Sequence, residues 1–225
     1  MPSRFAFFSS KEEIKAKFNV EIDDNIELHP YYNLKPTNRT TAIINNDGLH
    51  LVRMKWGYIN SMDQYKARAE TIHQKNLFKK AFKERRCVVL ANGFFEWVKE
   101  DKKSIPYYFS IKNEPLFPIA GIYNNHVDDE SGEMKYQVAV VTTEANNVVA
   151  QIFHRMPVIL NLEEFESWLD QNESEENLLK ILKPYKANEM QYWKVKPLPA
   201  RGDNGPATIK PAKKESKKGG LTDFL

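Results

Sequence analysis

Short apolar runs, rich in β-branched and aromatic residues, follow one another along most of the chain after residue 40. Two of them flank Asn46-Asp47-Gly48, and an Asp-Gly pair favours the positive backbone angles of a hairpin turn. Residues 40–56 are therefore predicted to form a β-hairpin. Further strands are predicted at residues 87–98, 107–111, 116–123, 136–142 and 190–196.

Helical patterns are fewer. Ser10 is followed three residues later by Glu13, which is the signature of a capping box, so a short helix is predicted at residues 11–19. Further helices are predicted at residues 67–83, 162–171 and 177–182. Since strands outnumber helices and are joined by hairpins rather than crossover helices, we expect an α+β fold. Its sheet should be curled and largely antiparallel, with short helices at its flanks.

The composition is that of a globular protein, with 41% hydrophobic and 28% charged residues among 225. We expect one domain over residues 1–211, followed by a polar, basic tail at 212–225 that is too hydrophilic to pack and should be flexible. The sequence has no apolar run of about 18 residues and no signal-peptide pattern. We therefore expect a cytoplasmic, monomeric protein without a membrane partner.

Cysteine and histidine usage argues against a metal site. The single cysteine, Cys87, excludes an intramolecular disulfide and a Cys-rich zinc site, and the five histidines show no ligand spacing. We expect no metal and no other cofactor. Cys87 lies in an apolar run and is predicted to be buried and unreactive.

Positive charge is concentrated in one segment of an otherwise nearly neutral domain. The whole chain has a formal net charge of +3, but residues 75–86 hold six lysines and arginines against a single glutamate. The segment is either the solvated face of a helix or a surface that contacts phosphates.

Three segments carry chemistry beyond that of a generic domain: KARAET at residues 66–71, RCVVLANGFFEW at 86–97 and IFHRMPVIL at 152–160. Together they resemble the SRAP family, the SOS-response-associated peptidases that process abasic sites. Matches to further family motifs occur, in order, at residues 1–5, 32–36, 56–57 and 203–211. The resemblance spans residues 1–211.

The resemblance implies a protein that binds single-stranded or junction DNA at abasic sites. Family members remove the initiator methionine, and the exposed cysteine condenses with the sugar aldehyde to give a stable thiazolidine. An asparagine, a glutamate and a histidine complete their active site. The glutamate of the family corresponds to Glu96 here, and the phosphate-binding arginines correspond to Arg4 and Arg68. Asn33, within a matching motif, is placed with the DNA-binding residues.

Three of the four active-site positions of the family are substituted in this chain. Pro2 stands at the cysteine position, Lys66 at the asparagine position and Phe153 at the histidine position, with His154 one place later. Without a thiol no thiazolidine can form. If residues 153–154 lie in a strand, His154 should face away from the site, because neighbouring side chains point to opposite faces.

Proline suggests a different covalent chemistry. After loss of Met1, Pro2 would present a secondary amine, and an α-amine has a pKa of about 8, against about 10.4 for a lysine. A cation at Lys66 would lower the pKa of this amine further. The amine would form an iminium with the sugar aldehyde, and Glu96 would move protons in its formation or in the β-elimination that follows.

Two other interpretations stay open. The chain is alternatively a catalytically degenerate protein that binds the lesion without bonding to it, or a peptidase that acts only on its own N-terminus. Arg68 grips a phosphate or forms an ion pair with Glu70, which lies on the same face if the segment alternates. Trp56 and Phe94 either stack on bases or belong to the core.

The last residues of the tail resemble a sliding-clamp-binding peptide. Leu221, Phe224 and Leu225 have the spacing of its aliphatic residue and its two bulky apolar residues, after a flexible tether. Lys218 replaces the customary leading glutamine. The tail is therefore either a clamp-binding segment or a frayed end with incidental apolar residues.

Overall fold

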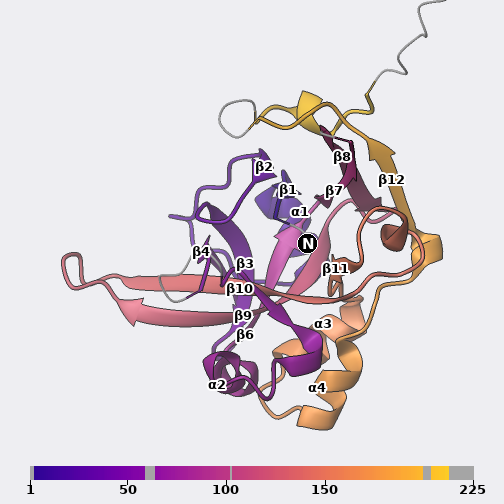
Figure 1. Ribbon diagram of the computed structural model, residues 1–225. Coiled ribbons are helices and arrows are strands. Elements are labelled where there is room, and N and C mark those ends of the chain that lie inside the picture. Colours follow the sequence, from indigo (N-terminus) through magenta and orange to yellow (C-terminus); the bar gives the residue numbers. More distant parts are fainter. Residues whose placement is uncertain (1–2, 59–63, 102, 200–203, 213–225) are drawn as a thin grey trace, which may run out of the picture.

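A computed structural model describes residues 3–58, 64–101, 103–199 and 204–212. In these residues the strands form two sheets that pack together (Figure 1). The first sheet has the order β12 (Met190–Lys194), β8 (Lys103–Ile111), β7 (Gly93–Glu100), β1 (Phe5–Phe7), β2 (Tyr31–Leu34). The second has the order β11 (Arg155–Pro157), β10 (Met134–Glu144), β4 (Leu49–Trp56), β3 (Arg39–Asn45), β6 (Arg86–Ala91), β9 (Phe117–Val127).

The second sheet closes on itself, because β9 also pairs with β10. A short strand, β5 (Lys66–Arg68), runs parallel to β10, as β4 does, whereas the other pairings between the named strands are antiparallel. The α+β class and the curled, largely antiparallel sheet are confirmed. The predicted hairpin at residues 40–56 corresponds to β3 and β4, with Asp47 (φ 53°) and Gly48 (φ 134°) in its turn.

Short helices flank the sheets. They are α1 (Lys11–Phe18), α2 (Asn76–Glu84), α3 (Leu162–Leu169) and α4 (Glu175–Ile181). Four 3₁₀ turns complete the described elements: η1 (Ala69–Thr71), η2 (Val149–Gln151), η3 (Ala187–Glu189) and η4 (Pro206–Ile209). Ser10 and Glu13 form the capping box of α1, as predicted. None of the helices in the described part of the chain has the length and apolar character needed to cross a membrane.

The helix predicted at residues 67–83 is wrong in its first half. Ala67 and Ala69 are buried while Arg68 and Glu70 are exposed, which is the two-residue period of a strand. Hydrogen bonding to β10 draws residues 66–68 into the sheet, the 3₁₀ turn η1 follows, and the α-helix begins only at residue 76. Here pairing with a distant strand overrides the local helix propensity.

The strand predicted at residues 87–98 is in fact two strands in different sheets, divided at Asn92. This buried side chain accepts a hydrogen bond from the amide of Phe8 (2.7 Å) and donates to Ser9 Oγ (3.0 Å) and to the carbonyl of Pro115 (2.6 Å). Asn92 thus ties the chain at the point where it leaves β6 and enters β7.

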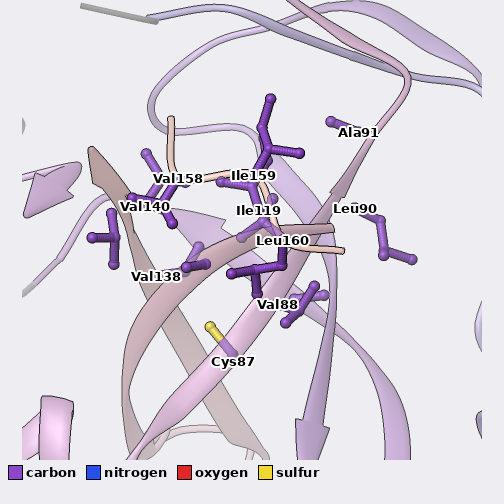
Figure 2. Packing of buried hydrophobic residues seen from close by; sticks show 14 of the residues in the cluster. Cys87, Val88, Leu90, Ala91, Ile119, Val138, Val140, Val158, Ile159 and Leu160 are labelled. Carbon is purple, nitrogen blue, oxygen red and sulfur yellow. The ribbon is translucent and has the colours of Figure 1, made fainter. Parts of the chain in front are cut away.

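The core is continuous across β6, β9, β10 and the segment after β11. Figure 2 shows Cys87, Val88 and Leu90 packed with apolar side chains of these elements. Cys87 is fully buried, as expected, and burial raises the pKa of its thiol far above the ordinary value.

Gly93, the first residue of β7, is required by close packing. A Cβ atom there would overlap the phenol ring of Tyr108, which is itself held by a hydrogen bond from its hydroxyl to the carbonyl of Asn92 (2.9 Å). Gly93→Ala is therefore expected to lower the free energy of unfolding by about 1–3 kcal/mol. Urea denaturation of the variant beside wild type measures this, and an unchanged midpoint would contradict the packing argument.

Candidate active site

Glu96 lies in the middle of β7, opposite Tyr107 of β8, and only 1% of the residue is exposed. Burial raises the pKa of its carboxyl to about 7, although the nearby charge of Lys66 acts in the opposite direction. A carboxyl with this pKa exchanges a proton readily near neutral pH. The structure therefore gives Glu96 the property that a general acid or base needs.

The N-terminal strand leads to Glu96. In the antiparallel pairing of β1 with β7, Phe5 lies opposite Phe94, and the amide of Phe95 donates to the carbonyl of Arg4 (3.1 Å). The strand pairing ends at Phe5, and the same register continued by two residues would set Ser3 opposite Glu96. The first described residues of the chain thus run beside the buried carboxyl. Pro2 lies outside the described residues.

Strand β5 contributes two cations. Lys66 and Arg68 flank the buried Ala67, so both point to the same face of the strand. Lys66 is half-buried; its ammonium group donates to the hydroxyl of Tyr65 (3.2 Å) and lies 4.6 Å from the centre of that ring. Arg68 is exposed. The structure therefore brings Lys66 near Glu96 and leaves Arg68 accessible at the edge of the same face.

The side chain of Arg4 is positioned by a hydrogen bond to Asn33. Its guanidinium donates to Asn33 Oδ1 (2.5 Å), and its partial burial lowers its pKa. Asn33 is itself buried in β2, where its amide and that of Tyr32 donate to Asn204 Oδ1 (3.0 and 2.7 Å). Asn33 therefore positions Arg4, and the motif at residues 203–211 anchors β2.

Arg155 and Glu70 form an ion pair that the sequence did not single out. Two guanidinium nitrogens of Arg155 donate to the two carboxylate oxygens of Glu70 (2.6 and 3.0 Å). Desolvation raises the pKa of Glu70, but the hydrogen bonds from Arg155 and the charge of Arg68 lower it, and the net pKa is below the ordinary value. The predicted alternative, in which Glu70 pairs with Arg68, is thus replaced by a pair with Arg155. Both partners lie in segments of the resemblance, the only signal that could have indicated them.

His154 lies in a turn, not in a strand. Strand β11 begins at Arg155, so the expectation that neighbouring side chains face opposite ways does not apply to residues 153–154. His154 is exposed, and its ring centre lies 4.4 Å from that of Phe153. In the described residues no hydrogen bond or ion pair joins it to Glu96 or Lys66, and its catalytic role stays a prediction.

The two aromatic residues considered for base stacking belong to the core. Trp56 is 1% exposed; it stacks on Phe5 with ring centres 4.4 Å apart and donates from its indole to the carbonyl of Tyr65 (2.9 Å). Phe94 is fully buried and stacks on Phe109 (5.0 Å). Neither ring offers a free face, so their assignment as DNA-binding residues is corrected.

The basic segment at residues 75–86 is largely the solvated face of a helix. Lys80 and Lys83 lie 4.0 and 3.9 Å from the carboxylates of Glu84 and Glu175, and Arg86 is buried. The segment is therefore less positive at the surface than its sequence suggests. The tail residues Leu221, Phe224 and Leu225 lie outside the described residues, and a clamp contact stays a prediction.

Comparison with known proteins decides the family. The sequence profile of the family described as "SOS response associated peptidase (SRAP)" matches residues 1–198. The chain belongs to the SRAP family. Among SRAP relatives, the abasic site processing protein YoqW of Bacillus subtilis is 36% identical over 211 residues, covering 88% of this chain and 93% of the relative. The abasic site processing protein YoaM of the same organism is 34% identical and covers 93% and 97%.

A solved structure supports the SRAP fold. A protein from Bacteroides thetaiotaomicron superimposes with a TM-score of 0.82 at 27% identity, over 93% of this chain and 99% of that one. Of the shared segments, β5 and β11 both pair with β10 in the second sheet, and the segment at residues 86–97 runs through β6 into β7 of the first sheet. The charge of Lys66 on β5 acts on Glu96 of β7.

Proposed function

We propose that this chain recognises and processes abasic sites in single-stranded or junction DNA. The observation that carries the proposal is the buried carboxyl of Glu96, with a pKa of about 7, beside the N-terminal strand and near Lys66. Relatives named abasic site processing proteins support the substrate class. Arg4 and Arg68 supply positive charge for the phosphates next to the lesion.

We further propose an iminium mechanism that starts from the Pro2 amine after removal of Met1. The nitrogen attacks C1′ of the ring-opened sugar, and the resulting hydroxyl leaves as water after protonation by Glu96. The iminium acidifies the C2′ hydrogen, a base removes it, and the C3′–O bond breaks as the 3′ phosphate leaves with its electron pair. Water then hydrolyses the conjugated iminium and restores the amine.

The alternative is a non-covalent lesion-binding protein. Two groups that the family uses, the cysteine thiol and the histidine, are missing from the site, because Pro2 replaces the cysteine and His154 is exposed. Their absence favours this alternative. Under this alternative Glu96 and Lys66 line a pocket for the sugar, and no bond to DNA forms.

Borohydride trapping separates the two. Protein whose loss of Met1 has been verified by intact mass is mixed with abasic or undamaged single strands, with and without borohydride, at two salt concentrations. We expect a covalent band with the abasic strand and borohydride only, and no band when the N-terminus is acetylated. Preferred binding of the abasic strand without any band would establish the non-covalent alternative. Equal affinity for abasic and undamaged strands would refute recognition itself.

A further inference from the structure

A second cationic feature lies beside the turn-side half of the long hairpin formed by β9 and β10, which projects from the body of the molecule (Figure 1). It is a cavity of about 330 Å³ at the meeting of β3, β4, β9 and β10. Four of its lining residues are cations and two are carboxylates: Arg39, Arg53, Lys55, Lys135, Asp128 and Glu133.

The strand register separates this cavity from Glu96 and Lys66. On β10, Lys55 is paired with Gln137, whereas Lys66 is paired with Val140, three residues along. Because side chains alternate along a strand, positions three apart point to opposite faces. Lys55 shares its face with Arg39, its partner across β3 and β4. The cavity is therefore a site of its own.

Both carboxylates in the cavity are already engaged. Asp128 accepts hydrogen bonds from the backbone amide and the hydroxyl of Ser131 (2.9 and 2.8 Å), and these bonds lower its pKa. Glu133 forms an ion pair with Lys135 (2.5 Å). Because Ser131 is neutral, Asp128 keeps its negative charge, and the four cations and two carboxylates leave the cavity with a formal net charge of +2.

Arg53 is held in place by neutral groups. Its guanidinium donates to Thr41 Oγ1 (2.8 Å) and to the backbone carbonyl of Arg39 (3.2 Å). Within the described part of the chain, no carboxylate forms an ion pair with Arg39, Arg53 or Lys55. Burial lowers the pKa of Arg53, and the neighbouring charge of Arg39 lowers it further. The cavity therefore keeps a net positive charge, which favours the binding of an anion.

We propose that this cavity binds backbone phosphates of a nucleic-acid strand, away from the lesion. Guanidinium groups match phosphate oxygens in a forked geometry, and Lys55 adds a point charge. Arg39 and Lys55 are exposed, so a polymer can reach them, and the ring of Tyr136 packs against Tyr123 rather than lying open for a base. The proposal rests on the proposed function only in that the chain binds DNA, not on any covalent step.

The test uses undamaged single strands, so that it does not depend on lesion recognition. The double variant Arg39→Gln/Lys55→Gln removes the exposed charges and leaves Arg53 with its Thr41 contact. Lys15→Gln/Lys194→Gln, at exposed lysines outside the cavity, is the matched control with the same change in charge. Kd is measured by fluorescence anisotropy for a short and a long strand over a series of salt concentrations.

For the long strand we expect the cavity variant to bind about 10-fold more weakly at low salt. Its salt slope should fall by roughly 1.4, or 0.7 for each lost phosphate contact on a single strand. The control should keep the wild-type slope. Equal slopes in both double variants would overturn the proposal. The proposal would also be overturned if the cavity bound inorganic phosphate or a deoxynucleoside monophosphate while the cavity variant kept full affinity for the long strand.

The proposed function fails by a different result. Equal wild-type affinity for abasic and undamaged strands would refute lesion recognition, yet the two double variants would still differ if the cavity binds phosphates.

Discussion

Glu96→Gln is expected to slow borohydride-dependent trapping on abasic strands by about 10²–10⁴-fold. The glutamine keeps the shape of the side chain but can neither donate nor accept a proton in the reaction. Affinity for the abasic strand should change little, because the phosphate contacts lie elsewhere. Glu100→Gln, an exposed carboxylate at the end of the same strand, is the matched control and should trap at the wild-type rate.

The pH profile identifies the direction of proton transfer by Glu96. Because burial places its pKa at about 7, the carboxyl is protonated below and ionised above this value. If Glu96 donates the proton that releases water, the trapping rate of wild type should fall above pH 7. If it acts as base, the rate should rise instead. A rate that is unchanged in Glu96→Gln at every pH would remove the residue from the mechanism.

The same substitution should raise stability at high pH, which tests the burial independently of activity. A carboxyl whose pKa rises from 4.5 to about 7 on folding stabilises the folded state fully below pH 4.5, and this contribution is lost as the pH rises through 7. Glu96→Gln should therefore exceed wild type by up to about 3 kcal/mol at pH 8 and by nothing near pH 4. Urea denaturation at both pH values measures the difference.

The sequence predicted most of the fold because its signals are local. The capping box of α1 and the Asp-Gly turn between β3 and β4 are each fixed by a few neighbouring residues, and both formed as expected. The segments at residues 67–83 and 87–98 depended on distant partners instead. Pairing with β10 makes residues 66–68 a strand, and the hydrogen bonds of Asn92 fix the point at which the chain passes from one sheet to the other. A local pattern does not carry this information.

The sequence named Lys66 and Glu96 as candidate site residues, but it did not predict how the fold arranges them. Lys66 and Glu96 are 30 positions apart in sequence, and the fold places their charges within reach of each other. Arg155 was only one residue of a motif in the sequence. In the structure it forms the ion pair with Glu70 that the sequence offered to Arg68, so Arg68 stays accessible. Trp56 was misassigned because the sequence does not distinguish an aromatic residue that stacks on a base from one that packs in the core, as Trp56 does against Phe5.

Arg86→Met is expected to lower the free energy of unfolding by about 3–5 kcal/mol, because several backbone carbonyls lose a charged hydrogen-bond donor. Arg86 is 1% exposed, and its guanidinium donates to four backbone carbonyls. These are the carbonyls of Phe82 (2.9 Å), Lys83 (2.6 Å), Trp168 (2.8 Å) and Asp170 (2.6 Å). They lie in or next to the last turns of α2 and α3, so one cation caps two helix ends that both carry partial negative charge.

Methionine fills a similar volume but cannot donate, so the substitution strands these carbonyls in or near the interior. Lys83→Met, at an exposed position one turn away, is the control and should stay within about 0.5 kcal/mol of wild type. If Arg86→Met does not fold, Arg86→Lys supplies the measurement, because it keeps the charge while losing the fork that reaches both helices. A loss under about 1 kcal/mol would mean that the two helix ends do not depend on Arg86, and that its place in the shared motif needs another explanation.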